Sequence, residues 1–572
     1  MKKKSVLIGI TSLLTLSLTS CDMLMDFINI ANPSKDDSSS FSESVASSKQ
    51  SIVDISTPPA DNIPANRASK NYSDFTKNNV YPLSCTPSVG EAKLLIIPVW
   101  FNDSSKFIKE DYKDSVRQDI HDAYFGDDVD SNTGIEKDTG WQSVKSYYET
   151  ESLGALNLTG TVSVWYEVDK NYSYYGSDPS NDTSGVPKTT ALVEEATNWY
   201  FANHSSESRS DYDCDNDGYL DGVMLIYAAP DYGTLNNDRY DNLWAFCYWV
   251  QDYTAQNISN PGVNAFFWAS YDFMYGREVA STRTGNRYGA GDTSHCKIDA
   301  HTFIHEMGHM FGLEDYYDYS DNAYCPAGGF SMQDYNVGGH DPFSSFALGW
   351  GKAYVPTDDA TIDLKPFSTS GEMILLTPTW NTYNSPFDEY ILLEYYTDGG
   401  LNNLDSTYGY MSSYGKAYPM GTKEYGIRVW HVDARLLYTS TGEFSASKVT
   451  SNPSIATARV ALMMSNTYND GSEEILGYLS PLAQDPTDPN YSAKYAEYNV
   501  LQMIRNKTSA TTKPKDLFGA SSLFKKGDSF SMNNYAKQFV NSGKLNSGKD
   551  LGFSFTVNAC NNTYASISVK KL

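Results

Sequence analysis

The chain has 572 residues, of which 40% are hydrophobic and 14% aromatic, enough apolar material for two or three packed domains. Its formal net charge is −27 at pH 7, so we expect no nucleic-acid partner, because phosphate binding needs clustered Lys and Arg. The 44 tyrosines, with abundant Asn, Ser, Asp and Gly, favour β-structure with many polar turns.

Residues 1–20 have the pattern of a secretory signal peptide, with three lysines after Met1 and then the apolar run Val6–Leu18. This run is too short for a comfortable membrane span, and no later stretch is long and apolar enough for one. The run leads into Leu-Thr-Ser-Cys21, which resembles a bacterial lipobox, so we expect lipid on Cys21 and anchoring at the extracellular face of the cell membrane. The alternative is ordinary secretion with an incidental cysteine. Residues 21–80, which are rich in Ser, Asp, Lys and Pro over 33–57, are then expected to form a disordered tether.

The next part of the chain, residues 81–355, is predicted to fold as one domain that contains both helices and strands. A continuous apolar run indicates a buried strand at 93–101, and alternation of apolar and polar residues indicates another at 155–166. Helices are predicted at 108–124, 142–150 and 190–201.

An acidic run, Asp-Cys-Asp-Asn-Asp-Gly-Tyr-Leu-Asp, occupies residues 213–221 and leads into an apolar strand at 223–228. Closely spaced carboxylates around a glycine turn provide the hard oxygen ligands that calcium prefers. The ligands would be Asp213, Asp215, Asp217, Asp221 and the carbonyl of Tyr219. The match to an EF-hand is incomplete, because Met224 stands where that motif has Glu and a strand follows in place of a helix. The alternative is an acidic surface turn.

The most informative motif is His305-Glu306-x-x-His309. Residues four apart on a helix share a face, so both imidazoles can reach one zinc ion, while Glu306 can take a proton from a metal-activated water. The apolar residues around the motif predict a buried helix, where two histidines and a glutamate need partners or a metal. His301 lies on the same face and is expected to be a packed or surface histidine.

After this helix, Gly312 can adopt positive φ and turn the chain sharply. Asp315 would then return to the metal as a third ligand and leave one position open for water, which is the arrangement of catalytic zinc sites. Glu314 is the alternative third ligand.

A third segment, residues 328–350, contains Gly-Gly-Phe-Ser-Met-Gln-Asp-Tyr and then Asp-Pro-Phe-Ser-Ser-Phe-Ala-Leu-Gly-Trp. The pattern predicts a short helix over 342–350 with Trp350 in the core. Tyr335 could donate a hydrogen bond to a developing oxyanion, or could be a tyrosine that packs beside the turn.

The pattern HExxHxxGxxD resembles the metzincin-type zinc peptidases. The longer run 305–318, together with segments 213–221 and 328–350, resembles the immune inhibitor A family (M6) of secreted bacterial metallopeptidases. The resemblance implies a mixed sheet with a zinc-binding helix, with Met332 as the methionine of a turn beneath the metal. The family usually has proline at the position of Glu314. Members often carry a pro-segment, for which residues 22–80 are short.

Residues 356–572 have short strands and many turns, which predicts a β-sandwich-like C-terminal domain and, for the whole chain, an α+β class. Strands are predicted at 373–376, 390–396, 425–432, 458–464 and 553–557, and residues 465–550 carry no clear pattern. His431 and Asp433 share a face of one strand, where a structural hydrogen bond is favoured over a metal. Six cysteines besides Cys21 could form up to three disulfides or remain free thiols.

Together these features predict a monomeric, membrane-anchored zinc endopeptidase that hydrolyses extracellular proteins or peptides, with a structural calcium ion. Two alternatives remain open at this point: a non-catalytic surface adhesin that keeps the fold, and a zinc hydrolase that acts on another amide or ester.

Overall fold

A computed structural model describes residues 86–126, 141–176, 185–235, 242–250, 256–275, 298–318, 325–378, 386, 388–407, 421–435, 437–438, 461–462, 466, 498–512 and 519–572. The predicted signal peptide, Cys21 and the predicted tether lie outside the described residues. In the described part of the chain, no helix combines the length and the apolar character that crossing a bilayer requires.

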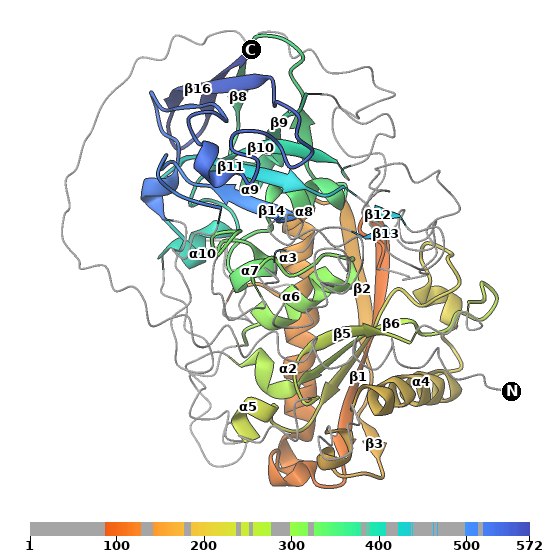
Figure 1. The fold of residues 1–572 in the computed structure, drawn as a ribbon. Coiled ribbons are helices and arrows are strands. Elements are labelled where there is room, and N and C mark those ends of the chain that lie inside the picture. The colour runs from red at the N-terminus through yellow and green to blue at the C-terminus, as the bar shows by residue number, and fades with distance from the viewer. Residues whose placement is uncertain are drawn as a thin grey trace, which may run out of the picture.

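The first half of the chain is organised around a six-stranded mixed sheet with the strand order β2-β1-β4-β6-β5, to which β3 adds beside β1 (Figure 1). The strands are β1 Gly90–Phe101, β2 Leu156–Val162, β3 Tyr166–Val168, β4 Val223–Tyr227, β5 Phe246–Trp249 and β6 Ala265–Ser270. Neighbouring strands run parallel except β5, which is antiparallel to β6 at one end of this order. The apolar run predicted as a buried strand forms most of β1, which has neighbours on both sides and is buried over most of its length.

Helices cover both faces of this sheet. The helices of this half of the chain are α2 Lys113–Phe125, α3 Val144–Glu151, α4 Val186–Asn203, α5 Tyr232–Leu235, α6 His301–Met310, α7 Met332–Tyr335 and α8 Pro342–Ala347. Figure 1 shows α2, α3 and α6 on one side of the sheet and α4 on the other. The first predicted helix starts later than expected, because a 3-10 turn at Glu110–Tyr112 precedes α2. The helix predicted over 342–350 ends earlier, since Gly349 has a φ of +84°.

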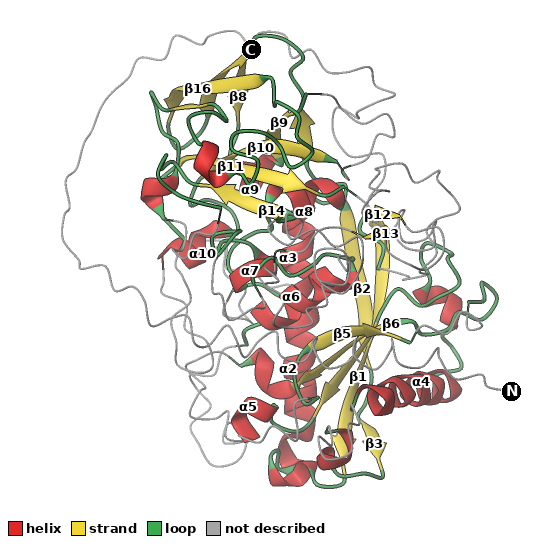
Figure 2. Cartoon of the chain, in the orientation of Figure 1, coloured by secondary structure: helices red, strands yellow, loops and turns green. Residues whose placement is uncertain are grey.

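The second half contains two further sheets, ordered β14-β11-β10-β9-β7 and β15-β16-β17-β8, and a two-stranded pair β12-β13. The strands are β7 Lys352–Tyr354, β8 Ala360–Leu364, β9 Glu372–Leu376, β10 Glu389–Tyr396, β11 Gly426–Asp433, β12 Leu437–Tyr438, β13 Ala461–Leu462, β14 Leu501–Ile504, β15 Ser529–Phe530, β16 Phe553–Cys560 and β17 Ala565–Lys571. Two short helices, α9 Phe367–Ser370 and α10 Asn402–Thr407, complete it. Figure 2 shows helices gathered around the first sheet and mostly strands and loops beyond it.

The five-stranded sheet lies between two apolar cores. Along β10, Ile391 and Leu393 belong to the core shared with the last sheet, whereas Tyr390 and Leu392 belong to the core of the first half of the chain. This alternation is the period of two expected of a strand with both faces buried. The α+β class is thus confirmed, and two sheets share a core where a β-sandwich was expected. The sandwich topology and the boundary at residue 355 stay predictions.

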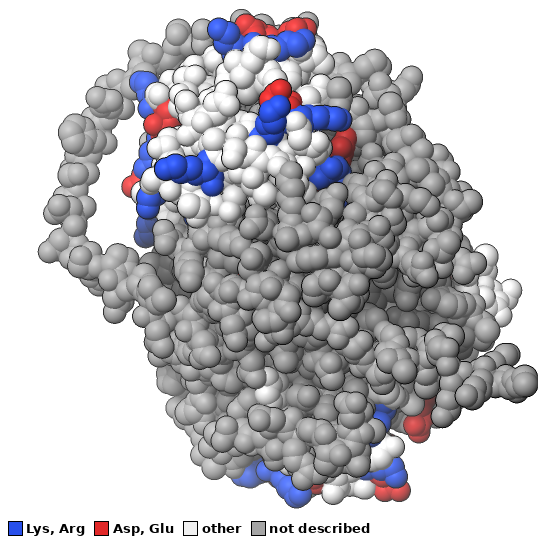
Figure 3. All heavy atoms as spheres, viewed as in Figure 1, with Lys and Arg blue, Asp and Glu red and all other residues white. Residues whose placement is uncertain are grey.

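Charged side chains of both signs lie on the described part of the surface. Figure 3 shows Lys and Arg side chains over the upper lobe, which holds the last sheet, with acidic side chains beside them. Lys525 pairs with Glu424 at 2.9 Å, and Lys571 pairs with Asp358 at 3.0 Å. These exposed pairs are typical of a solvated surface and contribute little stability.

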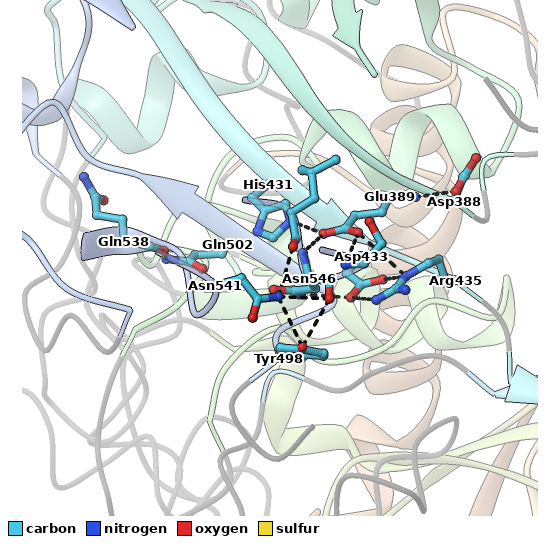
Figure 4. Close-up of polar contacts among 12 residues, drawn as sticks. Asp388, Glu389, His431, Asp433, Arg435, Tyr498, Gln502, Gln538, Asn541 and Asn546 are labelled. Atoms are coloured by element: carbon cyan, nitrogen blue, oxygen red, sulfur yellow. Dashed lines mark hydrogen bonds and ion pairs between the residues drawn. The ribbon is translucent and has the colours of Figure 1, made fainter. Parts of the chain in front are cut away.

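A buried polar network joins the C-terminal segment to the ends of β10 and β11 (Figure 4). His431 Nε2 lies 2.9 Å from Glu389 Oε1, and the same carboxylate accepts hydrogen bonds from the backbone N–H groups of Asn546 and Ser547. Asp433 accepts two hydrogen bonds from the Arg435 guanidinium and one from the Asn546 side chain. His431 and Asp433 therefore each make structural hydrogen bonds, as predicted, and the two residues have different partners.

We expect Glu389→Gln to lower the melting temperature at pH 7, because removing one partner of a buried ion pair costs about 3–5 kcal/mol. Burial alone would raise the pKa of Glu389, but the hydrogen bond and charge of His431, with Arg435, lower it to about 2. A lowered folded-state pKa stabilises the protein above about pH 4.5, and this stabilisation is lost as the pH falls toward 2.

The difference in melting temperature between wild type and Glu389→Gln should therefore shrink as the pH falls from about 4.5 toward 2. Thermal unfolding at several pH values measures it, with the exposed Asp358→Asn as the matched control. Equal melting temperatures at pH 7 would show that the network adds no stability.

Candidate metal centre and active site

Helix α6 carries the two histidines on its buried side. Phe303, Ile304, Met307 and Met310 of this helix are part of the apolar core, as predicted for a buried helix. The helix stops because Gly312 adopts a φ of +96°, a conformation that L side chains rarely take. The predicted helix and its glycine turn are both confirmed.

The turn brings Asp315 back to the histidines. Its Oδ1 atom lies 3.0 Å from His305 Nε2 and 3.3 Å from His309 Nε2, and the two Nε2 atoms are 3.2 Å apart. Ligands about 2.0–2.1 Å from a tetrahedral zinc ion lie about 3.3 Å from one another, so the three atoms have the spacing of one face of such a site. Glu314, the alternative third ligand, is not in this group of potential ligands in the described chain.

The second nitrogen of each imidazole binds a backbone carbonyl. His305 Nδ1 lies 2.7 Å from the carbonyl oxygen of Met332, and His309 Nδ1 lies 2.8 Å from that of Leu313. An Nδ1–H that donates to a carbonyl leaves Nε2 as the lone-pair nitrogen, which is the tautomer that binds a metal. Both side chains are therefore oriented for ligation.

The electrostatics of the cluster favour a positive charge between these side chains. Burial lowers the pKa of His309, but the Asp315 carboxylate beside it outweighs burial and raises the pKa to about 10. Burial acts against the charged form of Asp315 as well, yet His309 and His305 hold its pKa well below the usual range. A divalent cation would satisfy the same demand for positive charge, so the residues fit a metal ion.

Glu306 lies beside the first ligand and is 4% exposed. Burial raises the pKa of its carboxyl above the usual value, although His309 and His305 oppose the shift. A carboxylate with a raised pKa is a better proton acceptor near neutral pH, as general-base catalysis requires. Its backbone carbonyl accepts a hydrogen bond from the thiol of Cys247 on β5 at 2.9 Å.

The remaining predicted residues near the helix have different surroundings. Met332 is fully buried in α7, and its described polar contact to the cluster is the backbone carbonyl that His305 binds. The Tyr335 hydroxyl lies 3.9 Å from the Cys325 sulfur, so its oxyanion role stays a prediction. His301 is a packed histidine, as expected, stacked on Trp141 with ring centroids 4.2 Å apart.

The acidic loop gathers three of its predicted ligands. Carboxylate oxygens of Asp213, Asp215 and Asp221 lie within 4.8 Å of one another. Asp217 instead accepts a hydrogen bond from the backbone N–H of Tyr219 at 2.8 Å. Both oxygens of Asp221 also accept backbone N–H groups, from Cys214 and from Lys93 of β1, so this residue fastens the loop to the sheet.

Burial raises the pKa of Asp213 and raises that of Asp221 to about 7. The ionised loop is therefore under electrostatic strain that a cation would relieve.

The four described cysteines outside the predicted anchor, Cys214, Cys247, Cys325 and Cys560, are free thiols.

Two contacts at the metal cluster were not predicted from the sequence. One is the pair of carbonyls that orient the histidines, which has no side-chain signature. The other is the Gln333 amide, whose Nε2 lies 3.4 Å from His309 Nδ1. The available sequence signal for the second contact was Gly308, which lies between the two histidines. Its missing side chain leaves a space beside the helix, and Gln333 fills that space.

Comparisons with known proteins agree with this geometry. Residues 88–331 match the family model of the immune inhibitor A peptidase M6 catalytic domain. The pre-pro-metalloprotease PrtV of Vibrio cholerae serotype O1 is 28% identical over 199 residues, with the same values for two strains. That alignment covers 31% of this chain and 19% of PrtV, so the shared part spans about a fifth of the relative's length. The region that matches the family model includes both histidines, Glu306 and Asp315, so residues 88–331 are similar to the catalytic domain of the immune inhibitor A (M6) peptidases, which supports a metallopeptidase.

Proposed function

We propose that this protein is a zinc-dependent endopeptidase that cleaves extracellular proteins or peptides. The observation that carries the proposal is the convergence of His305, His309 and Asp315, at the spacing of zinc ligands, with Glu306 beside them on the same helix. Zinc is the preferred metal because two imidazoles and one carboxylate, with one position open, form a common catalytic zinc site.

A zinc ion held by these three residues would polarise the scissile carbonyl and lower the pKa of a water molecule. Glu306 accepts the proton from the water as its oxygen attacks the carbonyl carbon. When the C–N bond breaks, Glu306 gives this proton to the leaving amine nitrogen, so the carboxylate is regenerated. The hydrogen bonds from His305 to Met332 and from His309 to Leu313 keep the imidazoles in place throughout.

Casein cleavage by the purified full-length chain tests the proposal. We expect peptide products, complete inhibition by a zinc chelator, and recovery when zinc is added after the chelator is removed. Hydrolysis of model esters without peptide products would support a different zinc hydrolase. Zinc binding without any hydrolysis would support the adhesin, and cleavage that survives metal removal would contradict the proposal.

We also propose that the acidic loop binds one calcium ion, through Asp213, Asp215 and Asp221 with the carbonyl of Tyr219. The support is the clustering of three partly or fully buried carboxylates around a turn that leads directly into β4. A cation there would hold the loop against unfolding and self-digestion, because binding to the native state alone stabilises it.

Calcium should raise the melting temperature of the wild type and have little effect on Asp215→Asn. At a calcium concentration of about 100 times the dissociation constant, the expected stabilisation is about 2.7 kcal/mol. Thermal unfolding with calcium and with a calcium chelator measures the difference, and Asp169→Asn, at an exposed aspartate elsewhere, serves as the control. An equal rise in Asp215→Asn would place the calcium elsewhere.

The location of the protein is a separate proposal. The run before Cys21 supports lipid on that cysteine and a position on the extracellular face of the membrane. In bacterial cells, wild type should partition with membranes and Cys21→Ser should not. Mass spectrometry of the N-terminal peptide would detect the lipid directly.

A further inference from the structure

Gln333 follows Met332 in the turn beneath the zinc helix and is fully buried. Residues 332 and 333 contact both predicted histidine ligands and the residue that follows Asp315. The Met332 carbonyl binds His305, the Gln333 amide lies beside His309, and the Gln333 carbonyl accepts the N–H of Tyr316, next to Asp315.

The Gln333 side chain fits against a gap in the helix. A Cβ atom built on Gly308 would lie 2.2 Å from Gln333 Oε1 and 2.6 Å from its Cδ. Gly308 stands between the two histidines in sequence, and its lack of a side chain lets the amide approach the helix backbone and reach His309. The glycine at 308 and the glutamine at 333 are thus complementary in shape.

Packing alone does not account for a glutamine at this position. Its Oε1 atom is buried and has no hydrogen-bond partner among the described residues, a state that costs free energy and that an apolar side chain of equal size would avoid. A role for the amide in the metal-bound state explains this cost.

The tautomer of His309 indicates what that role is. When Nε2 binds a metal, Nδ1 carries the hydrogen and donates to Leu313. A rotation of 180° about the last bond of the side chain would present Oε1 of Gln333 to the same N–H as a second acceptor. Partners of this kind fix the ring and strengthen the imidazole as a ligand.

We propose that Gln333 is a positioning residue that orients His309 toward the metal, and that Gly308 is the complement that admits its amide. This inference rests on the proposed function, since it presumes that His309 binds zinc. Gln333 itself does not touch the substrate or the metal.

The decisive variant is Gln333→Met, which keeps the volume against Gly308 and removes the amide. The zinc dissociation constant, measured by competition with a chromophoric chelator, should rise about 10- to 100-fold. The melting temperature of the zinc-free chain should change little, and the visible spectrum of the cobalt-substituted chain should shift. Gln333→Glu, which keeps an acceptor, should restore most of the affinity. Gln502→Met removes a buried amide in β14 and is the matched control, with unchanged affinity.

A second pair of variants separates packing from the polar contact. Gly308→Ala should weaken zinc binding and lower the melting temperature, whereas Gly308→Ala with Gln333→Ala should recover the melting temperature and leave the zinc affinity low. If Gln333→Met bound zinc with wild-type affinity, the proposed role of Gln333 would be overturned, while the proposed zinc site would stand. If the wild-type chain itself bound no zinc, the proposed function would fail first, and this inference with it.

Discussion

Glu306→Gln should reduce kcat/KM for peptide cleavage by about 100- to 10,000-fold, the range that a general base contributes. Glutamine has nearly the same shape but cannot accept the proton from the attacking water. Because Glu306 is not one of the three converging ligands, the variant should bind zinc as tightly as the wild type. Kinetics with a fluorogenic peptide and a zinc assay on the same sample measure both quantities.

The pH profile gives an independent check on the same residue. Burial raises the pKa of Glu306, so its acidic form should persist above the usual pH for a glutamate. Since only the ionised form accepts a proton, activity should fall as the pH drops through this raised pKa. A variant that loses zinc along with activity would instead assign Glu306 a structural role.

Asp315→Ala should abolish cleavage by removing one of three ligands. The loss of zinc affinity should exceed the roughly 10- to 100-fold expected when a partner outside the ligand set is removed. The remaining histidines are buried, and they also lose the carboxylate that lies 3.0 and 3.3 Å from their Nε2 atoms.

Glu314→Gln is the matched control for this variant. It changes the neighbouring carboxylate, which is the alternative ligand on sequence grounds, and it should retain zinc and most of the activity. If the two variants exchanged these phenotypes, Glu314 would be the third ligand and the geometry described above would be wrong for the metal-bound protein.

The sequence was most informative where short-range rules decide the structure. The spacing of His305 and His309 defines a helix face, and Gly312 supplies a turn that few other residues allow, so the helix and the return to Asp315 could both be predicted. The apolar run at 93–101 was equally clear, because a strand buried on both faces needs apolar residues throughout.

The sequence was least informative where contacts depend on distant segments. Glu389 meets His431 only through the register of β10 on β11, and two further partners, Asn546 and Ser547, lie more than 150 residues away. Residues 465–550 carried no clear pattern, yet they include β14, a short strand that completes the five-stranded sheet. Likewise, the fit of Gln333 against Gly308 depends on how a turn 25 residues later packs on the helix.

Zinc titration of the metal-free full-length chain tests the central claim most directly. Peptide cleavage should rise linearly with added zinc and stop rising at one zinc ion per chain, while Glu306→Gln binds the same single ion and stays inactive. Full activity in the metal-free chain, or an active Glu306→Gln variant, would contradict the assignment of His305, His309, Asp315 and Glu306 as a zinc peptidase site.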